Sequence, residues 1–199
     1  MHSKTALLTA FALTTFIPAV LGGNAIIENQ CDQDVYLWSV AGSADVQMVT
    51  LPPGKNYSEK YRLNDNGGGI SMKLALAKHQ GDITQFEYTL AGGNIWYDVS
   101  NINGNPFQDG GIAVKPSDPA CSPVVCQAGV VKCREAYNMP YDDHATHACP
   151  ETSDLNVVLC PGTNKPPGTA GQPTHKLKVT HLSDGSAKRH LHHPHYRHA

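Results

Sequence analysis

Hydrophobic and polar residues alternate in short runs along most of the chain, separated by turns rich in Gly, Pro, Asn and Asp. The clearest run is 70–78, where Ile70, Met72 and Leu74 face one side and polar or small residues face the other. Further strands are predicted at 25–28, 35–40, 47–51, 57–63, 111–115 and 155–159, with two more inside 83–106. Strands that recur about every 8–12 residues, without a long helix, predict an all-β fold built as an antiparallel β-sandwich.

The segment 83–106 predicts a β-hairpin around the turn Ala91-Gly92-Gly93-Asn94. If the residues on either side of this turn pair with each other, one face of the hairpin is apolar and the other is polar. The apolar face then carries the pairs Leu90–Ile95, Tyr88–Tyr97 and Phe86–Val99, and the polar face carries Thr89–Trp96, Glu87–Asp98 and Gln85–Ser100.

Two carboxylates, Glu87 and Asp98, lie directly opposite each other in this register. Their Cβ atoms are expected about 5 Å apart, a distance at which like charges destabilise a sheet. A fold keeps such a pair at low cost only where a cation, a metal or a ligand uses it. The pair is therefore the first candidate for a functional site.

Residues 1–22 are predicted to form a secretory signal peptide. Lys4 precedes an apolar run at 6–17, and small residues then lead to a cleavage site before Gly23. The run is too short for a membrane span, and no second apolar segment follows it. The mature protein is therefore expected to be soluble and secreted.

Residues 163–199 are predicted to be a disordered, basic tail, because Pro, Gly, Thr, Lys and His dominate there without apolar periodicity. Several neutral imidazoles on a flexible chain can converge on Zn(II) or Cu(II). The candidate ligands are His190, His192, His193, His195 and His198. The alternative is a solvated tail whose positive charge rises below about pH 6.5.

Charge divides the chain into two parts. Residues 23–160 carry 8 Lys and Arg against 16 Asp and Glu, whereas 161–199 carry 6 Lys and Arg against Asp184 alone. An acidic domain is a poor candidate for binding nucleic acid or an anionic membrane. We therefore expect neither partner.

Six cysteines lie in the mature part: Cys31, Cys121, Cys126, Cys133, Cys149 and Cys160. An even number in an oxidising compartment predicts three disulfides, with fifteen possible connectivities. A zinc site built from Cys and His is the alternative. The cysteine-dense stretch 118–150 is predicted to form irregular, disulfide-clamped loops at one end of the sandwich.

Two smaller features carry candidate chemistry. The tripeptide Asn56-Tyr57-Ser58 is an N-glycosylation sequon beside a Pro-Pro-Gly turn, so Asn56 is predicted to carry a glycan, with an unoccupied turn as the alternative. His144 and His147 lie near two acids and can be read either as a small metal site or as surface histidines. Those acids are Asp142 and Asp143.

Several segments, in their order along the chain, resemble thaumatin-like proteins. They are AIIENQC with VYLWS, GGISMK, TQFEYTL with WYDVSNINGNP, CREAYNMPYDDHATHAC and LNVVLCP. The resemblance covers residues 24–162 and is strongest to small fungal secreted members, of the yeast-phase-specific or antigenic type. It implies a thaumatin-like domain over 23–162 and the disulfides Cys31–Cys160, Cys121–Cys149 and Cys126–Cys133.

The resemblance also implies an acidic groove. In the family, a basic residue and four acids line a groove that binds β-1,3-glucan and in some members hydrolyses it. The matching residues here are Lys73, Glu87, Asp98 and Asp143, while Asn103 stands where the family has an aspartate. The long cysteine-rich segment that forms the far wall of the groove is absent from this sequence, so an open, shallow cleft is expected.

Three functions follow as hypotheses. The favoured one is a monomeric, non-enzymatic protein that needs no cofactor and binds β-glucan or a similar polysaccharide at a cell wall or host surface. The second is a weak endo-β-1,3-glucanase with Glu87 as general acid and Asp98 as second carboxylate, since carboxyl groups about 5–5.5 Å apart suit a retaining mechanism. In this hypothesis Lys73 offsets the negative charge and Asp143 is a spare base. The third is capture of Zn or Cu by the tail.

Overall fold

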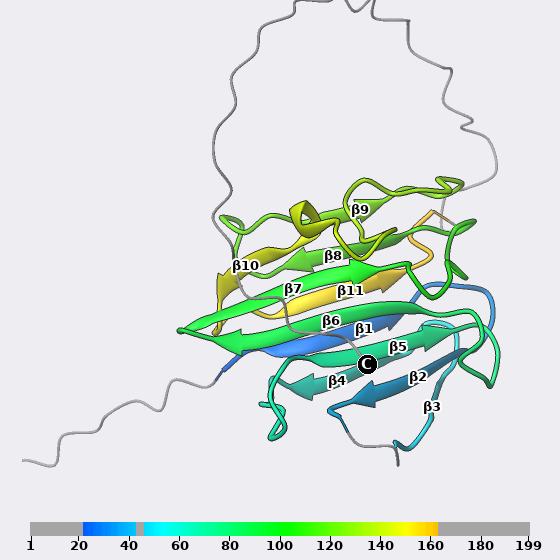
Figure 1. Ribbon diagram of the computed structural model, residues 1–199. Coiled ribbons are helices and arrows are strands. Elements are labelled where there is room, and N and C mark those ends of the chain that lie inside the picture. Colours follow the sequence, from blue (N-terminus) through cyan, green and yellow to red (C-terminus); the bar gives the residue numbers. More distant parts are fainter. Residues whose placement is uncertain (1–21, 43–45, 163–199) are drawn as a thin grey trace, which may run out of the picture.

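The computed structural model describes residues 22–42 and 46–162, whose strands form two β-sheets stacked face to face (Figure 1). The predicted signal peptide, apart from Gly22, and the predicted histidine-rich tail lie outside the described residues. The five-stranded sheet has the order β4 (Asn56–Lys60), β1 (Asn24–Asn29), β11 (Leu155–Leu159), β8 (Ile112–Pro116), β9 (Val124–Cys126). The six-stranded sheet has the order β10 (His147–Pro150), β7 (Asn94–Ser100), β6 (Thr84–Ala91), β5 (Ile70–Ala75), β2 (Val35–Val40), β3 (Val49–Leu51).

This architecture confirms the predicted all-β sandwich, with differences in detail. The pairing of β1 with β11 is parallel, whereas the other strand pairs are antiparallel. The stretch 118–150 is not wholly irregular, because it contains β9, β10 and the short 3-10 helix Asp143–Ala145. Figure 1 places β9 and β10 together, so this stretch closes one lateral edge of the sandwich.

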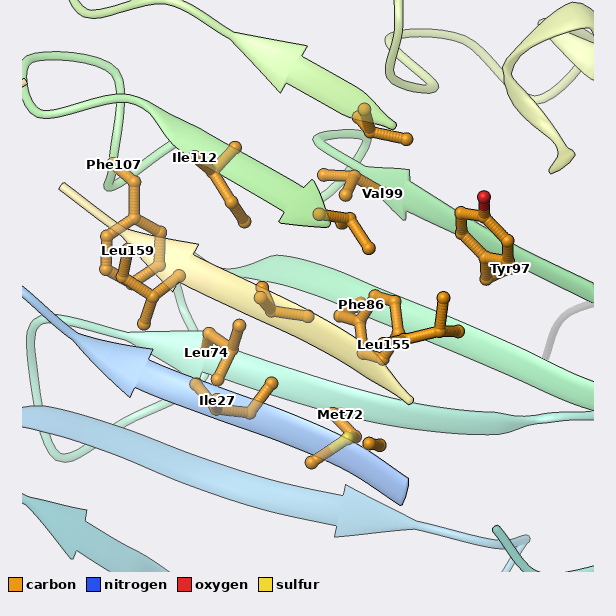
Figure 2. Packing of buried hydrophobic residues seen from close by; sticks show 14 of the residues in the cluster. Ile27, Met72, Leu74, Phe86, Tyr97, Val99, Phe107, Ile112, Leu155 and Leu159 are labelled. Atoms are coloured by element: carbon orange, nitrogen blue, oxygen red, sulfur yellow. The ribbon is translucent and has the colours of Figure 1, made fainter. Parts of the chain in front are cut away.

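Alternation of side chains explains how the sheets meet. Along β6 and β7 the buried residues are every second one, and they face the other sheet across a common core. Figure 2 shows this layer, in which Phe86, Tyr97 and Val99 of one sheet approach residues such as Ile112 and Leu155 of the other. The polar partners on β6 and β7 consequently point away from the core, onto the outer face of the six-stranded sheet.

The hairpin turn is tighter than the sequence suggested. Ala91 pairs with Asn94, which leaves a loop of Gly92 and Gly93 alone. Both glycines have positive φ, 61° and 76°. A two-residue turn of this kind matches the twist of the flanking strands and requires φ > 0 at both positions, which explains the glycine pair.

Three disulfides join the pairs that the resemblance implied. Cys31–Cys160 spans 129 positions and connects the end of β1 to the end of β11. Cys121–Cys149 and Cys126–Cys133 span 28 and 7 positions and hold the edge around β9 and β10. No helix in residues 22–42 and 46–162 is long and apolar enough to cross a membrane.

At the opposite lateral edge, a polar cluster around Glu59 links the two sheets. Glu59 lies on β4 of the five-stranded sheet, and its Oε1 accepts hydrogen bonds from the hydroxyls of Ser39 (2.9 Å) and Tyr88 (2.7 Å) of the six-stranded sheet. Its Oε2 accepts one from the Tyr57 hydroxyl (2.9 Å), and Arg62 Nε lies 3.8 Å from Oε1. The carboxylate therefore has several donors and one cation.

Candidate functional site

The acid pair forms as the hairpin register predicted. Glu87 of β6 pairs directly with Asp98 of β7, and all six predicted cross-strand pairs occur. Both side chains are half-buried on the outer face of the six-stranded sheet, because their neighbours Phe86 and Val99 point into the core. The structure thus places two carboxylates side by side on a surface facing away from the sandwich interior.

Asp98 is the more constrained member of the pair. Its Oδ1 is buried and accepts no hydrogen bond from the described residues. Burial, and secondarily the charge of Glu87, raises the pKa of Asp98 well above its usual range. A protonated carboxyl next to an ionised one is the arrangement that a general acid needs. Burial therefore makes Asp98 a candidate for the protonated member of the pair, a role that the sequence analysis gave to Glu87.

Tyr137 connects this pair to the third acid. Its backbone N–H donates to Val99 O at 2.8 Å, which fixes it beside β7. Its hydroxyl lies 2.7 Å from Thr146 Oγ1 and 3.4 Å from Asp143 Oδ1. Burial raises the pKa of Tyr137, the hydrogen bond with Thr146 opposes this rise, and the charges of Asp98 and Asp143 add to it. The Tyr137 hydroxyl therefore contacts Asp143 and also lies within the electrostatic influence of Asp98.

The remaining groove residues lie on a neighbouring row of the same face. Lys73 of β5 pairs with Gln85 of β6, and its ammonium donates to Gln80 Oε1 at 3.1 Å. Gln85 donates to Asn103 Oδ1 at 3.1 Å. Lys73, the candidate cation, thus makes a hydrogen bond to a neutral amide. Asn103 is connected to this row by its hydrogen bond with Gln85.

An exposed aromatic residue flanks the acids. Trp96 is two positions from Asp98 on β7, so the two side chains share the outer face. Trp96 pairs with Thr89, the residue two positions beyond Glu87 on β6, and is 45% exposed. Tyr141, which is 81% exposed, lies in the loop that leads to Asp143. Trp96 therefore provides an exposed aromatic surface beside the acid pair.

The loop histidines do not assemble a metal site with their acidic neighbours. His144 Nε2 lies 3.0 Å from Arg134 O, whereas His147 belongs to β10 and its ring centroid is 5.7 Å from that of Tyr97. Asp142 Oδ2 accepts two backbone N–H groups, which lower its pKa. Within the described part of the chain, the group with metal-ligand proximity is Asp118, Cys121 and Cys149, and its two thiols are joined as a disulfide.

Comparison with known proteins gives the family. A family model described as Blastomyces yeast-phase-specific protein matches residues 12–161. An antigenic thaumatin-like protein of Arthroderma benhamiae is 50% identical over 196 residues, which cover 96% of this chain and 98% of the relative. The chain belongs to the thaumatin-like protein family.

Further relatives agree with this membership. The secreted thaumatin-like protein calA of Emericella nidulans is 40% identical over 158 residues, 77% of this chain and 91% of that protein. Among solved structures, the protein elicitor MoHrip2 of Magnaporthe oryzae superposes with a TM-score of 0.58 at 26% identity, covering 69% of this chain and 98% of that one. The thaumatin-like fold therefore accounts for the described sandwich.

Two residues of the site were not singled out from the sequence. Alternation puts Trp96 on the polar face with Glu87 and Asp98, and a large aromatic residue among polar ones was the available signal. Tyr137 belongs to the segment CREAYNMPYDDHATHAC, which carried the thaumatin-like resemblance, but nothing in its spacing indicated a position next to β7. That contact depends on the folding back of a loop onto a strand about 40 positions earlier in sequence, which local patterns do not reveal.

Proposed function

We propose that this thaumatin-like protein is secreted and binds β-1,3-glucan or a similar cell-wall polysaccharide, without hydrolysing it, on the outer face of the six-stranded sheet. The observation that carries the proposal is the carboxylate pair Glu87–Asp98 with the exposed Trp96 beside it. Sugar hydroxyls donate hydrogen bonds to carboxylates, and an exposed indole offers a broad apolar surface for the ring of a sugar. The name of the Emericella relative supports an extracellular location.

Two features favour binding over hydrolysis. Asn103 replaces one acid, and the Lys73 ammonium donates to Gln80. Hydrolysis in a glycosidase depends on a site that excludes bulk water and orients the substrate. An open face with carboxylates and an aromatic side chain suits reversible contact with a long polymer.

Co-sedimentation with insoluble β-1,3-glucan tests this proposal. Trp96→Ala should weaken binding at least about fivefold, the loss of roughly 1 kcal/mol of aromatic contact. Val125→Ala is a matched control, because Val125 is 47% exposed on β9 of the other sheet. Glu87→Gln and Asp98→Asn should retain most of the binding, since an amide still hydrogen-bonds sugar hydroxyls. Equal binding by wild type and Trp96→Ala would reject this face as the site.

The second candidate, weak endo-β-1,3-glucanase activity, is favoured by one observation. Burial raises the pKa of Asp98 and so favours its protonated form, directly opposite a second carboxyl group on Glu87. Release of reducing sugar from laminarin, abolished by either Glu87→Gln or Asp98→Asn, would establish it. No release at any pH from about 4 to 7, the range in which such pairs titrate, would exclude it.

The third candidate concerns the histidine-rich tail, which lies outside the described residues. Its sequence HLHHPHYRH supports binding of Zn(II) or Cu(II) in addition to glucan. Truncation after Pro161 should then abolish the response in metal titrations, and an unchanged titration would exclude the tail as the metal site. The same truncated chain should bind glucan as the full chain does.

A further inference from the structure

The outer face of the five-stranded sheet, on the opposite side of the molecule from the acid pair, contains a hollow of about 490 Å³. Residues of β4, β1, β11 and β8 line it, among them Asn56, Glu28, Ile26, Asn156 and Lys115. Sheet register explains why they share one face: Glu28 pairs with Asn56, and Ile26 pairs with Asn156, which in turn pairs with Lys115. The hollow therefore runs across four strands from the Asn56 side.

Asn56 opens this hollow and is also the acceptor position of the sequon Asn56-Tyr57-Ser58. It is exposed at the start of β4, the edge strand of the sheet, directly after the turn that contains Gly54. An edge strand pairs on one side only, so a bulky group on its first residue meets no neighbouring strand on the free side. The position is thus open to modification and adjoins a surface that can receive the modifying group.

One polar atom in the hollow lacks a partner. The Oδ1 of Asn156 is buried and accepts no hydrogen bond from the described residues. A buried unsatisfied acceptor is costly and calls for a donor that the protein itself does not provide. Ile26, next to it, is an incompletely buried apolar side chain on the same face. The floor of the hollow thus places the half-buried side chain of Asn156 beside an apolar patch, which suits the hydroxyl or acetamido groups and the apolar faces of sugars.

We propose that Asn56 carries an N-linked glycan whose first sugars lie in this hollow and donate a hydrogen bond to Asn156. Asn56 and Asn156 are separated by two strand spacings and by two residues along the strand direction, about 12 Å in all, a distance that a short oligosaccharide spans. The glycan covers Ile26. This site is separate from the proposed glucan-binding face and does not depend on it.

The modification is a transfer from a lipid pyrophosphate-linked oligosaccharide of the secretory pathway. A bond forms between Asn56 Nδ2 and C1 of the reducing-end sugar, while the bond from C1 to the pyrophosphate oxygen breaks. The lipid pyrophosphate leaves, and the proton lost by the amide balances the charge. The hydroxyl of Ser58 completes the sequon that the transferring enzyme recognises.

Expression of the full chain in a eukaryotic secretory host, followed by intact-mass measurement, tests the modification. Wild type should show a mass increase that an amidase specific for N-linked glycans removes. Ser58→Ala should lack the increase because it destroys the sequon, and Ser58→Thr should restore it. Absence of the increase in wild type, or its persistence in Ser58→Ala, overturns the proposal.

NMR of the same proteins tests the position of the glycan. The side-chain amide signals of Asn156 should differ between wild type and Ser58→Ala and coincide between wild type and Ser58→Thr. The amide of Asn138 is a matched control, because it is held by Cys133 O and Ala136 O in a distant loop and should not change. If glycosylated wild type and Ser58→Ala have equal Asn156 signals, the glycan projects into solvent. That result overturns the proposed position of the glycan in the hollow.

Discussion

Two half-buried carboxylates, Glu59 of the five-stranded sheet and Asp98 of the six-stranded sheet, have contrasting surroundings. Glu59 reaches this sheet from β4 and accepts hydrogen bonds from Ser39, Tyr57 and Tyr88, with Arg62 beside it. Asp98 lies on the outer face, faces Glu87, and has one oxygen buried without a partner among the described residues. The Glu59 carboxylate has hydrogen-bond donors and a cation beside it, whereas burial and the charge of Glu87 destabilise the ionised form of Asp98.

The difference separates a structural acid from a candidate functional one. A buried charge with several donors joins elements that would otherwise be held by apolar contact alone. A carboxyl group held next to another acid and desolvated is instead ready to exchange a proton or to meet an external donor. The free energy of unfolding should therefore change in opposite directions when the charge is removed at the two sites.

The largest expected effect comes from Glu59→Ala. Loss of the carboxylate leaves the buried Tyr88 hydroxyl and Ser39 without their acceptor, so the free energy of unfolding should fall by about 3 kcal/mol. Urea denaturation monitored by fluorescence measures this change. Lys60→Ala, the next residue on β4 but exposed, should stay within about 0.5 kcal/mol of wild type. Equal stabilities of the two variants would contradict a structural role for Glu59.

A smaller effect of opposite sign is expected for Asp98→Asn. The folded-state pKa of Asp98 lies above its unfolded value, so the folded protein binds the proton more tightly. Stability is therefore greatest below the unfolded pKa of about 4 and declines as pH rises through the folded pKa. At pH 8 the variant should be more stable than wild type by about 1 kcal/mol, the cost of like charges paired on a sheet.

Urea denaturation at pH 4 and pH 8 checks this prediction. The stability gain of Asp98→Asn should be present at pH 8 and shrink toward pH 4, where wild-type Asp98 is protonated in the folded state and about half protonated in the unfolded state. Glu87→Gln serves as a partner variant, because it removes the charge opposite Asp98. A gain that is equal at both pH values would mean that packing, rather than charge, is responsible.

Much of the fold was predictable because it depends on local pattern. Alternation in 83–106 was sufficient to predict all six cross-strand pairs, and with them the position of Glu87 opposite Asp98. Alternation does not reveal which distant strands pair, so the parallel pairing of β1 with β11 was missed. The three-residue strand β9 was missed too, since so short a run beside cysteines carries little periodic signal.

The site was predictable only in part. The opposed acids followed from register, whereas the approach of Tyr137 to Asp143 and the hydrogen bond from Lys73 to Gln80 depend on loop conformation. The Glu59 cluster was missed entirely, because its donors come from three different strands. A single glutamate in the alternating run 56–60 gives no indication that it points inward toward hydroxyl groups.

The smallest expected effect is that of Tyr57→Phe, which removes one of the hydroxyls bound to Glu59. The hydrogen bond to Glu59, together with burial, raises the pKa of Tyr57 to about 12, with burial the larger cause. Because Tyr57 is only half-buried, water replaces part of the lost bond, and the free energy of unfolding should fall by about 0.5–1 kcal/mol. If the hydroxyl acts through Glu59, the same substitution should cost almost nothing in a Glu59→Ala background. Additive losses in the double variant would show that the Tyr57 hydroxyl stabilises the fold independently of Glu59, and the contrast with Asp98 would then rest on Ser39, Tyr88 and Arg62.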